Sequence, residues 1–99
     1  MSNNMNKYQK DLQALRPHDE IQNIEQYTRD GRTWDFISTA SHGFLIVPVT
    51  NLYYQLAVKV QNRSCYGYRS PLAIYLEEDC QAVEFLDALP KGEPIQAVL

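Results

Sequence analysis

The stretch RDGRTWDFIST, residues 29–39, decides the fold. Its Asp30-Gly31 dipeptide favours the positive backbone angles of a tight hairpin turn. The residues after the turn are rich in β-branched and aromatic side chains, with Trp34 and Phe36 two apart and therefore on one face of a strand. A strand that closes a hairpin needs a partner before it. We therefore predict a strand over residues 20–28, although the spacing of their apolar side chains also suits a helix.

Two further segments extend this sheet. A Ser-His-Gly turn leads into the apolar run of residues 44–47, which stops at Pro48, and residues 72–76 form a second buried run. The first three strands follow one another through short turns, and this order predicts a three-stranded antiparallel meander.

Three helices are expected around the strands. The apolar side chains of residues 7–15 recur at the spacing of one helical face. Thr50 is a favourable N-cap for a helix that runs to Val60 with Leu52 on its apolar face. The acidic residues 77–79 begin the last helix, because carboxylates favour the positive end of the helix dipole. The predicted class is α+β, a three-stranded antiparallel meander plus a further strand, packed against two to three helices.

The length of the chain predicts its number of domains, and its charge and apolar runs indicate which partners and locations to expect. We predict a flexible N-terminus at residues 1–6 and a single α+β domain over residues 7–99. Nine basic against twelve acidic side chains give a net charge of −3, and the absence of a basic run disfavours direct nucleic-acid binding. The sequence shows no secretion signal and no apolar run that could cross a bilayer, so we expect a cytoplasmic protein with reduced cysteines and no membrane partner.

Two short polar segments hold most of the chemically capable side chains. Residues 38–43 read STASHG and residues 77–80 read EEDC, and each follows a predicted strand. In the first segment we expect the hydroxyl groups to satisfy turn amides and Gly43 to adopt a positive φ. We expect His42 to lie within hydrogen-bonding reach, directly or through one water, of Glu77, Glu78 or Asp79.

Catalysis and metal binding are the weaker interpretations of these segments. Cys80 follows three acidic residues, whose charge favours the thiol over the thiolate, so we expect a buried structural cysteine. Ser41 and His42 are neighbours on a turn and are poorly placed to act as nucleophile and base, and a single histidine makes a poor metal site. We therefore predict a protein that is not an enzyme and binds no metal or cofactor. The alternative is a small enzyme or a ligand- or metal-binding module that uses His42 with Glu77-Glu78-Asp79-Cys80.

The motifs WDFISTASHGF and YLEEDC resemble those of a group of small uncharacterised proteins found in phages, plasmids and their bacterial hosts. In that group a strand with a tryptophan ends in S-T-x-S-H-G-G, and Y-E-E-D-C begins a helix some tens of residues later. The resemblance covers residues 20–89, with Phe44 in place of a second glycine and Leu76 between the tyrosine and the first glutamate. It implies a mobile-element context without a particular activity. It draws attention to Trp34, Ser41, His42, Gly43, Glu77, Glu78, Asp79 and Cys80.

The preferred function class is binding. We expect a small mobile-element-associated accessory protein that binds a host protein or protein complex, as a stoichiometric inhibitor of a host defence complex of the anti-CRISPR or anti-restriction type. Seven tyrosines and a concentration of acidic residues near one end of the chain favour this class over the alternative. Association between copies of the chain is also compatible with these features. The residues expected to supply contacts are Ser41, His42, Tyr53, Tyr66, Tyr68, Glu77, Glu78, Asp79, Glu84 and Asp87.

Overall fold

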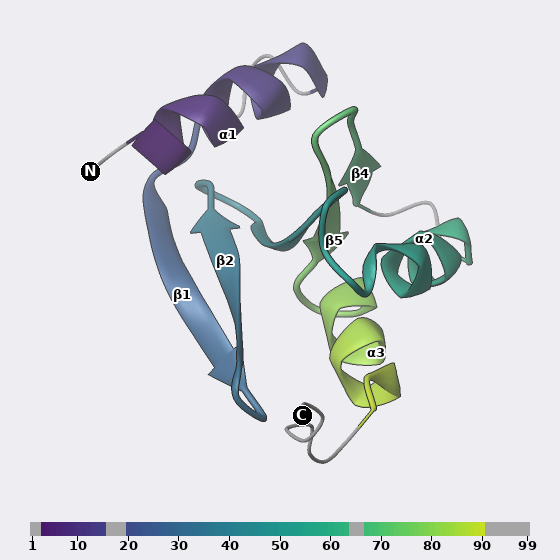
Figure 1. The fold of residues 1–99 in the computed structure, drawn as a ribbon. Helices are drawn as coiled ribbons and strands as arrows, with labels where there is room; N and C mark the ends of the chain where they lie inside the picture. The colour runs from purple at the N-terminus through teal and green to yellow at the C-terminus, as the bar shows by residue number, and fades with distance from the viewer. Residues whose placement is uncertain (1–2, 16–19, 64–66, 91–99) are drawn as a thin grey trace.

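The chain folds into a five-stranded antiparallel sheet with helices on both faces (Figure 1). The computed structural model describes residues 3–15, 20–63 and 67–90. Neighbouring strands follow the order β1-β2-β3-β5-β4. This arrangement confirms the predicted α+β class. The elements are α1 (Asn3–Leu15), β1 (Asn23–Arg29), β2 (Arg32–Ser38), β3 (Gly43–Pro48), α2 (Tyr54–Asn62), β4 (Tyr68–Arg69), β5 (Ala73–Glu77) and α3 (Gln81–Ala88).

The hairpin between β1 and β2 is built as the sequence predicts. Asp30 and Gly31 have φ angles of 53° and 78°, and positive values at both central residues define a type I′ turn. The turn joins the pair Arg29–Arg32, and the register continues to place Tyr27 opposite Trp34. The predicted meander of β1, β2 and β3 is confirmed.

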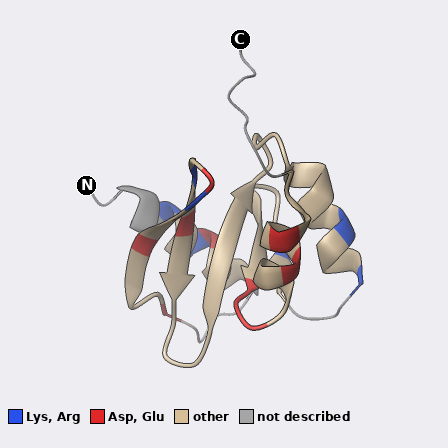
Figure 2. Cartoon of the chain, turned by 90° about the horizontal axis from the view of Figure 1, so that it is seen from below, with Lys and Arg blue, Asp and Glu red and all other residues tan. Residues whose placement is uncertain are grey.

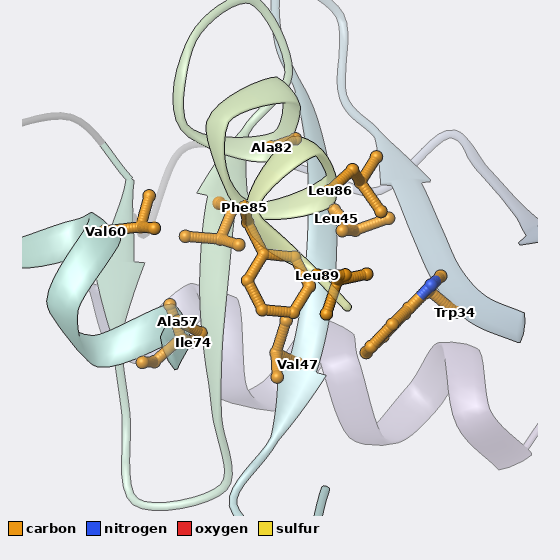
Figure 3. Packing of buried hydrophobic residues seen from close by; sticks show 11 residues of the cluster. Trp34, Leu45, Val47, Ala57, Val60, Ile74, Ala82, Phe85, Leu86 and Leu89 are labelled. Carbon is orange, nitrogen blue, oxygen red and sulfur yellow. The ribbon is translucent and has the colours of Figure 1, made fainter. Parts of the chain in front are cut away.

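One face of the sheet is covered by α2 and α3 (Figure 3). Trp34 of β2 packs edge-on against Phe85 of α3, with ring centroids 5.2 Å apart and planes at 83°. Phe36, on the same side of β2, packs against this cluster and is half-buried. The prediction that both side chains lie under one of the last two helices is therefore confirmed. The buried members of this cluster are Trp34, Leu45, Val47, Ala57, Val60, Ile74, Leu76, Ala82, Phe85, Leu86 and Leu89.

The opposite face is covered by α1, which is attached by two tyrosine–carboxylate hydrogen bonds. The hydroxyl of Tyr8 in α1 donates to Asp35 Oδ2 in β2 at 2.6 Å. In the reverse sense, the hydroxyl of Tyr75 in β5 donates to Asp11 Oδ2 in α1, also at 2.6 Å. Ser70 Oγ donates to the same Asp11 oxygen at 2.6 Å. Both tyrosines are buried, so these bonds fix the position of α1 at an apolar interface.

The second helix begins later than predicted. Thr50 is not its N-cap, because the chain makes a turn in which the Asn51 amide donates to Pro48 O at 2.9 Å. The Asn51 side chain then accepts the Tyr53 amide at 2.8 Å, a local bond that competes with helix formation. Leu52, predicted on the apolar face, is consequently 84% exposed.

The other helix boundaries also differ from the predictions. The acidic residues 77–79 do not begin α3: Glu77 ends β5, and the next three residues form a turn before Gln81. Within this turn the Asp79 amide donates to Glu77 Oε1 at 3.1 Å. At the other end of the chain α1 begins at Asn3, four residues before the predicted start, while the flexibility expected for residues 1–6 stays a prediction.

The tyrosine–carboxylate bonds predict a loss of stability at alkaline pH. Burial and the hydrogen bonds to aspartate raise the pKa of Tyr8 and Tyr75 above the usual value. An unfolded tyrosine releases its proton from about pH 10, whereas the native protein retains it, so the stabilisation is complete below this pH and decreases above it.

The measurement is the free energy of unfolding in urea between pH 8 and pH 11. A Tyr8→Phe/Tyr75→Phe variant should show a shallower decrease above about pH 10 than the wild type. Tyr27→Phe, a substitution on exposed β1, controls for the loss of a hydroxyl group. Equal alkaline slopes in wild type and double variant would contradict this explanation.

Candidate functional site

The two polar segments singled out in the sequence meet in the fold. Strand β3 pairs with β5, which places Phe44 opposite Glu77. Immediately beyond this pair, the Glu78 amide donates to Gly43 O at 2.9 Å. The STASHG and EEDC segments therefore lie side by side at one end of the sheet.

Among the described residues, His42 makes no direct contact of the kind predicted for it, and a contact through one water stays a prediction. Its amide donates to Thr39 Oγ1 at 3.2 Å and its carbonyl accepts the Thr39 amide at 2.8 Å, so the hydroxyl satisfies the turn as expected. The imidazole packs on Phe44, with ring centroids 6.0 Å apart. Within the described part of the chain, no hydrogen bond or ion pair joins the ring to Glu77, Glu78 or Asp79.

The two faces of the sheet separate His42 from Glu78, whereas Glu77 lies opposite Phe44 on the His42 side, where its Oε1 accepts the Asp79 amide. Phe44, with His42 against it, belongs to the cluster under α1. The Glu78 side chain lies on the α3 side, where its Oε1 would be 2.5 Å from a Cβ placed on Gly43. The ring of Phe36 would be 2.7 Å from the same Cβ. Gly43 is therefore required by this close approach and not, as predicted, by a positive φ, which among the described glycines is found at Gly31 and Gly67.

The other chemically capable side chains are dispersed. Cys80 is exposed as a free thiol and is not the buried cysteine that we expected, because it is the last residue of the exposed turn that precedes α3. Ser41 is exposed on the β2–β3 turn. In the ranges that the structure describes, no three His, Cys, Asp or Glu side chains are grouped to hold a metal ion.

The tyrosines proposed for contacts are largely engaged inside the molecule. Arg32 Nη2 donates to the Tyr53 hydroxyl at 3.3 Å, and the guanidinium lies 5.0 Å from the centre of the ring. Tyr68 is half-buried, with its ring centroid 5.5 Å from that of Phe44. Tyr66 lies outside the described residues.

The acidic residues near the β5–α3 turn divide into two groups. Figure 2 shows them on this turn and on α3, with other acidic residues on the β1–β2 hairpin. On the helix, Glu84 pairs with Arg63, and Asp87 pairs with Arg29 at 3.0 Å. On the turn and nearby, the exposed Glu78 makes no ion pair within the described residues. The negative charge that remains available to a partner is therefore displaced from α3 towards the turn.

An apolar groove that the sequence did not indicate opens beside this turn. It has a volume of about 320 Å³ and runs between the β1–β2 hairpin and α3. Its apolar lining comes from both sides, with Glu25 and Glu78 also on its wall. The exposed Val83 of α3 and Tyr27 of β1, at 51% and 41% exposure, stand at its two sides. The lining residues are Glu25, Gln26, Tyr27, Phe36, Leu45, Glu78, Ala82, Val83 and Leu86.

The groove exists because α3 is short and leans over the centre of the sheet. Its buried side chains pack on β2, β3 and β5. Strand β1 lies further out and is left exposed along most of its length. The pattern of polar and apolar residues along the sequence does not predict this groove, because the groove depends on where α3 lies in the folded protein.

Comparison of the chain with protein-family models, curated proteins and solved structures gives no match. The resemblance to proteins of phages and plasmids accordingly stays a prediction. None of the helices in the described ranges is long and apolar enough to span a membrane.

The close approach of the Phe36 ring to Gly43 gives a prediction about stability. Gly43→Ala should reduce the free energy of unfolding by roughly 1–3 kcal/mol, because the new methyl group collides with the Phe36 ring. Chemical denaturation measures this loss. In a Phe36→Leu background the ring atoms are gone, so the cost of Gly43→Ala should be smaller. An unchanged cost in that background would show that the collision with Phe36 is not the cause.

Proposed function

We propose that this protein acts by binding, as a stoichiometric inhibitor that occupies a surface of a larger host protein or complex. The type we favour is the anti-CRISPR or anti-restriction inhibitor of a host defence complex. The observation that supports binding most directly is the apolar groove between the β1–β2 hairpin and α3, with carboxylates on its wall. Its occupant is a basic amphipathic segment of the partner.

The apolar part of the groove supplies the affinity. Phe36 is half-buried and Val83 is half-exposed, so both have surface left to lose to a partner. Burying such surface is favourable by about 25 cal/mol for each Å² removed from water. Exposed apolar side chains that line one concavity, with polar groups around them, are the usual anatomy of a protein-binding patch.

The two carboxylates on the groove wall determine the specificity for a basic partner. Glu25 and Glu78 are exposed on opposite walls and form no ion pair within the described residues. Lysine or arginine side chains that flank an apolar anchor would meet both of them. Charge complementarity of this kind accelerates association and disfavours acidic partners.

The residues that carry this surface differ from those expected from sequence. Glu84 and Asp87 were expected to contact the partner, but each already pairs with an arginine of the same chain. Reversing their charge would disturb α3 contacts as well as any interface. Glu25 and Glu78 are the cleaner positions for a test. The alternative enzyme or ligand-binding function would use His42 with the EEDC cluster, but among the described residues no hydrogen bond or ion pair joins the His42 ring to that cluster.

The test is affinity purification from host lysate treated with nuclease, followed by binding measurements with the purified partner. Glu25→Lys/Glu78→Lys should lower the affinity roughly tenfold or more, with a larger loss at low salt. Val83→Ser should weaken binding at every salt concentration, since it removes apolar contact without changing the charge. Glu20→Lys, an exposed position outside the groove, is the matched charge control.

Two results would overturn the proposal. One is a partner that binds the groove variants as tightly as the wild type. The other is a His42→Ala variant that loses biological activity while partner binding is unchanged, because this would identify the protein as an enzyme.

A further inference from the structure

We infer that two copies of this chain associate through β1, whose open edges pair antiparallel about Tyr27 and join the two sheets into one. This inference does not rest on the proposed host partner, but it uses Glu25 and Tyr27, which also line the groove, so a second copy and a host partner would compete for these two residues. It rests on the asymmetry between the two edges of the sheet and on the side chains that β1 carries.

The two edges of the sheet are built differently. One edge is β4, which has only two residues, and short edge strands are a common protection against unwanted pairing. The other edge is β1, which has seven residues in continuous register with β2. Its sequence NIEQYTR contains no proline and no lysine, and in the described part of the chain no element pairs with its outer side (Figure 1). Strand β1 therefore lacks the short length, the proline and the lysine that commonly protect a free edge, although it carries Glu25 and Arg29.

The hairpin turn determines which backbone groups of β1 face outwards. A type I′ turn closes on a hydrogen-bonded pair, here Arg29–Arg32. Hydrogen-bonded and non-hydrogen-bonded pairs then alternate along the strand. The N–H and C=O groups of Ile24, Gln26 and Thr28 consequently point away from β2, where a further strand can bind them.

The side chains of β1 are self-complementary in one register. When Tyr27 faces Tyr27 of the second copy, Glu25 of each copy faces Arg29 of the other, which gives two ion pairs around one aromatic pair. Centring the pairing on Gln26 instead places Glu25 opposite Tyr27 and forms neither ion pair. Arg29 already pairs with Asp87 at 3.0 Å, and its guanidinium has enough donors to contact both carboxylates.

The geometry at Tyr27 allows the register to be measured. In the proposed pairing Tyr27 is at a non-hydrogen-bonded position, where facing Cα atoms are about 4.5 Å apart, within the range that a disulfide spans. We place single cysteines at Tyr27 or at Gln26, in a background where Cys65 and Cys80 are serine. Under mild oxidation Tyr27→Cys should form a covalent dimer at least about ten times faster than Gln26→Cys. Faster cross-linking at Gln26 would overturn the proposed register.

The oligomeric state tests the edge itself. Light scattering after size exclusion should show that the wild-type protein is a dimer at concentrations on the order of 100 µM. A dimer that forms at this concentration is weak but specific. Tyr27→Lys places two ammonium groups opposite each other, and Gln26→Pro removes an outward amide without breaking the backbone hydrogen bonds to β2, although it loses the side-chain bond to Asp35. Both variants should be monomeric, with circular dichroism showing that the sheet is retained. A wild type that stays monomeric, or a folded Tyr27→Lys variant that still dimerises, would refute the inference.

Discussion

The burial of β3 on both faces is the constraint on which the rest of the structure depends. Four consecutive apolar residues, Phe44 to Val47, alternate between the two sides of the sheet, and all four are at most 1% exposed. Neither side can face water without losing the stabilisation that drives folding. The chain therefore needs helices on both faces, with α2 and α3 over Leu45 and Val47, and α1 over Phe44 and Ile46. A two-layer fold, which suffices for a sheet with one apolar face, would leave this strand half exposed.

The sequence predicted the structure correctly where few residue types allow the required backbone geometry. Asp30-Gly31 allows both positive φ angles of the type I′ turn, and the alternation after it placed Trp34 on the face later covered by α3. Helix starts were less predictable, because short polar side chains offer the backbone competing bonds. The Asn51 side chain accepts the Tyr53 amide, and Thr50 does not cap the helix as predicted. The Glu77 carboxylate accepts the Asp79 amide.

The candidate site was less accessible from sequence than the fold. The meeting of the STASHG and EEDC segments follows from strand pairing and could be expected. The orientation of His42 and Glu78 towards opposite faces could not be predicted, because it depends on the side chain or backbone against which each residue packs. Counting acidic residues also overstated the charge of α3, since Arg63 and Arg29 come from distant parts of the chain to pair with it. The groove is a tertiary feature, set by the gap between a short helix and an outer strand.

The edge-to-face packing of Trp34 on Phe85 has a consequence for the way the chain folds. Strands β1, β2 and β3 are joined by short turns and pair locally, whereas β5 reaches β3 only after α2 and β4. Closing the longer loop costs more chain entropy, so the meander forms readily before α3 arrives. Trp34 is the only tryptophan in the chain, and in this order of events we expect it to become buried when Phe85 packs against it. Its fluorescence therefore reports the arrival of the last helix, separately from the circular dichroism of the sheet.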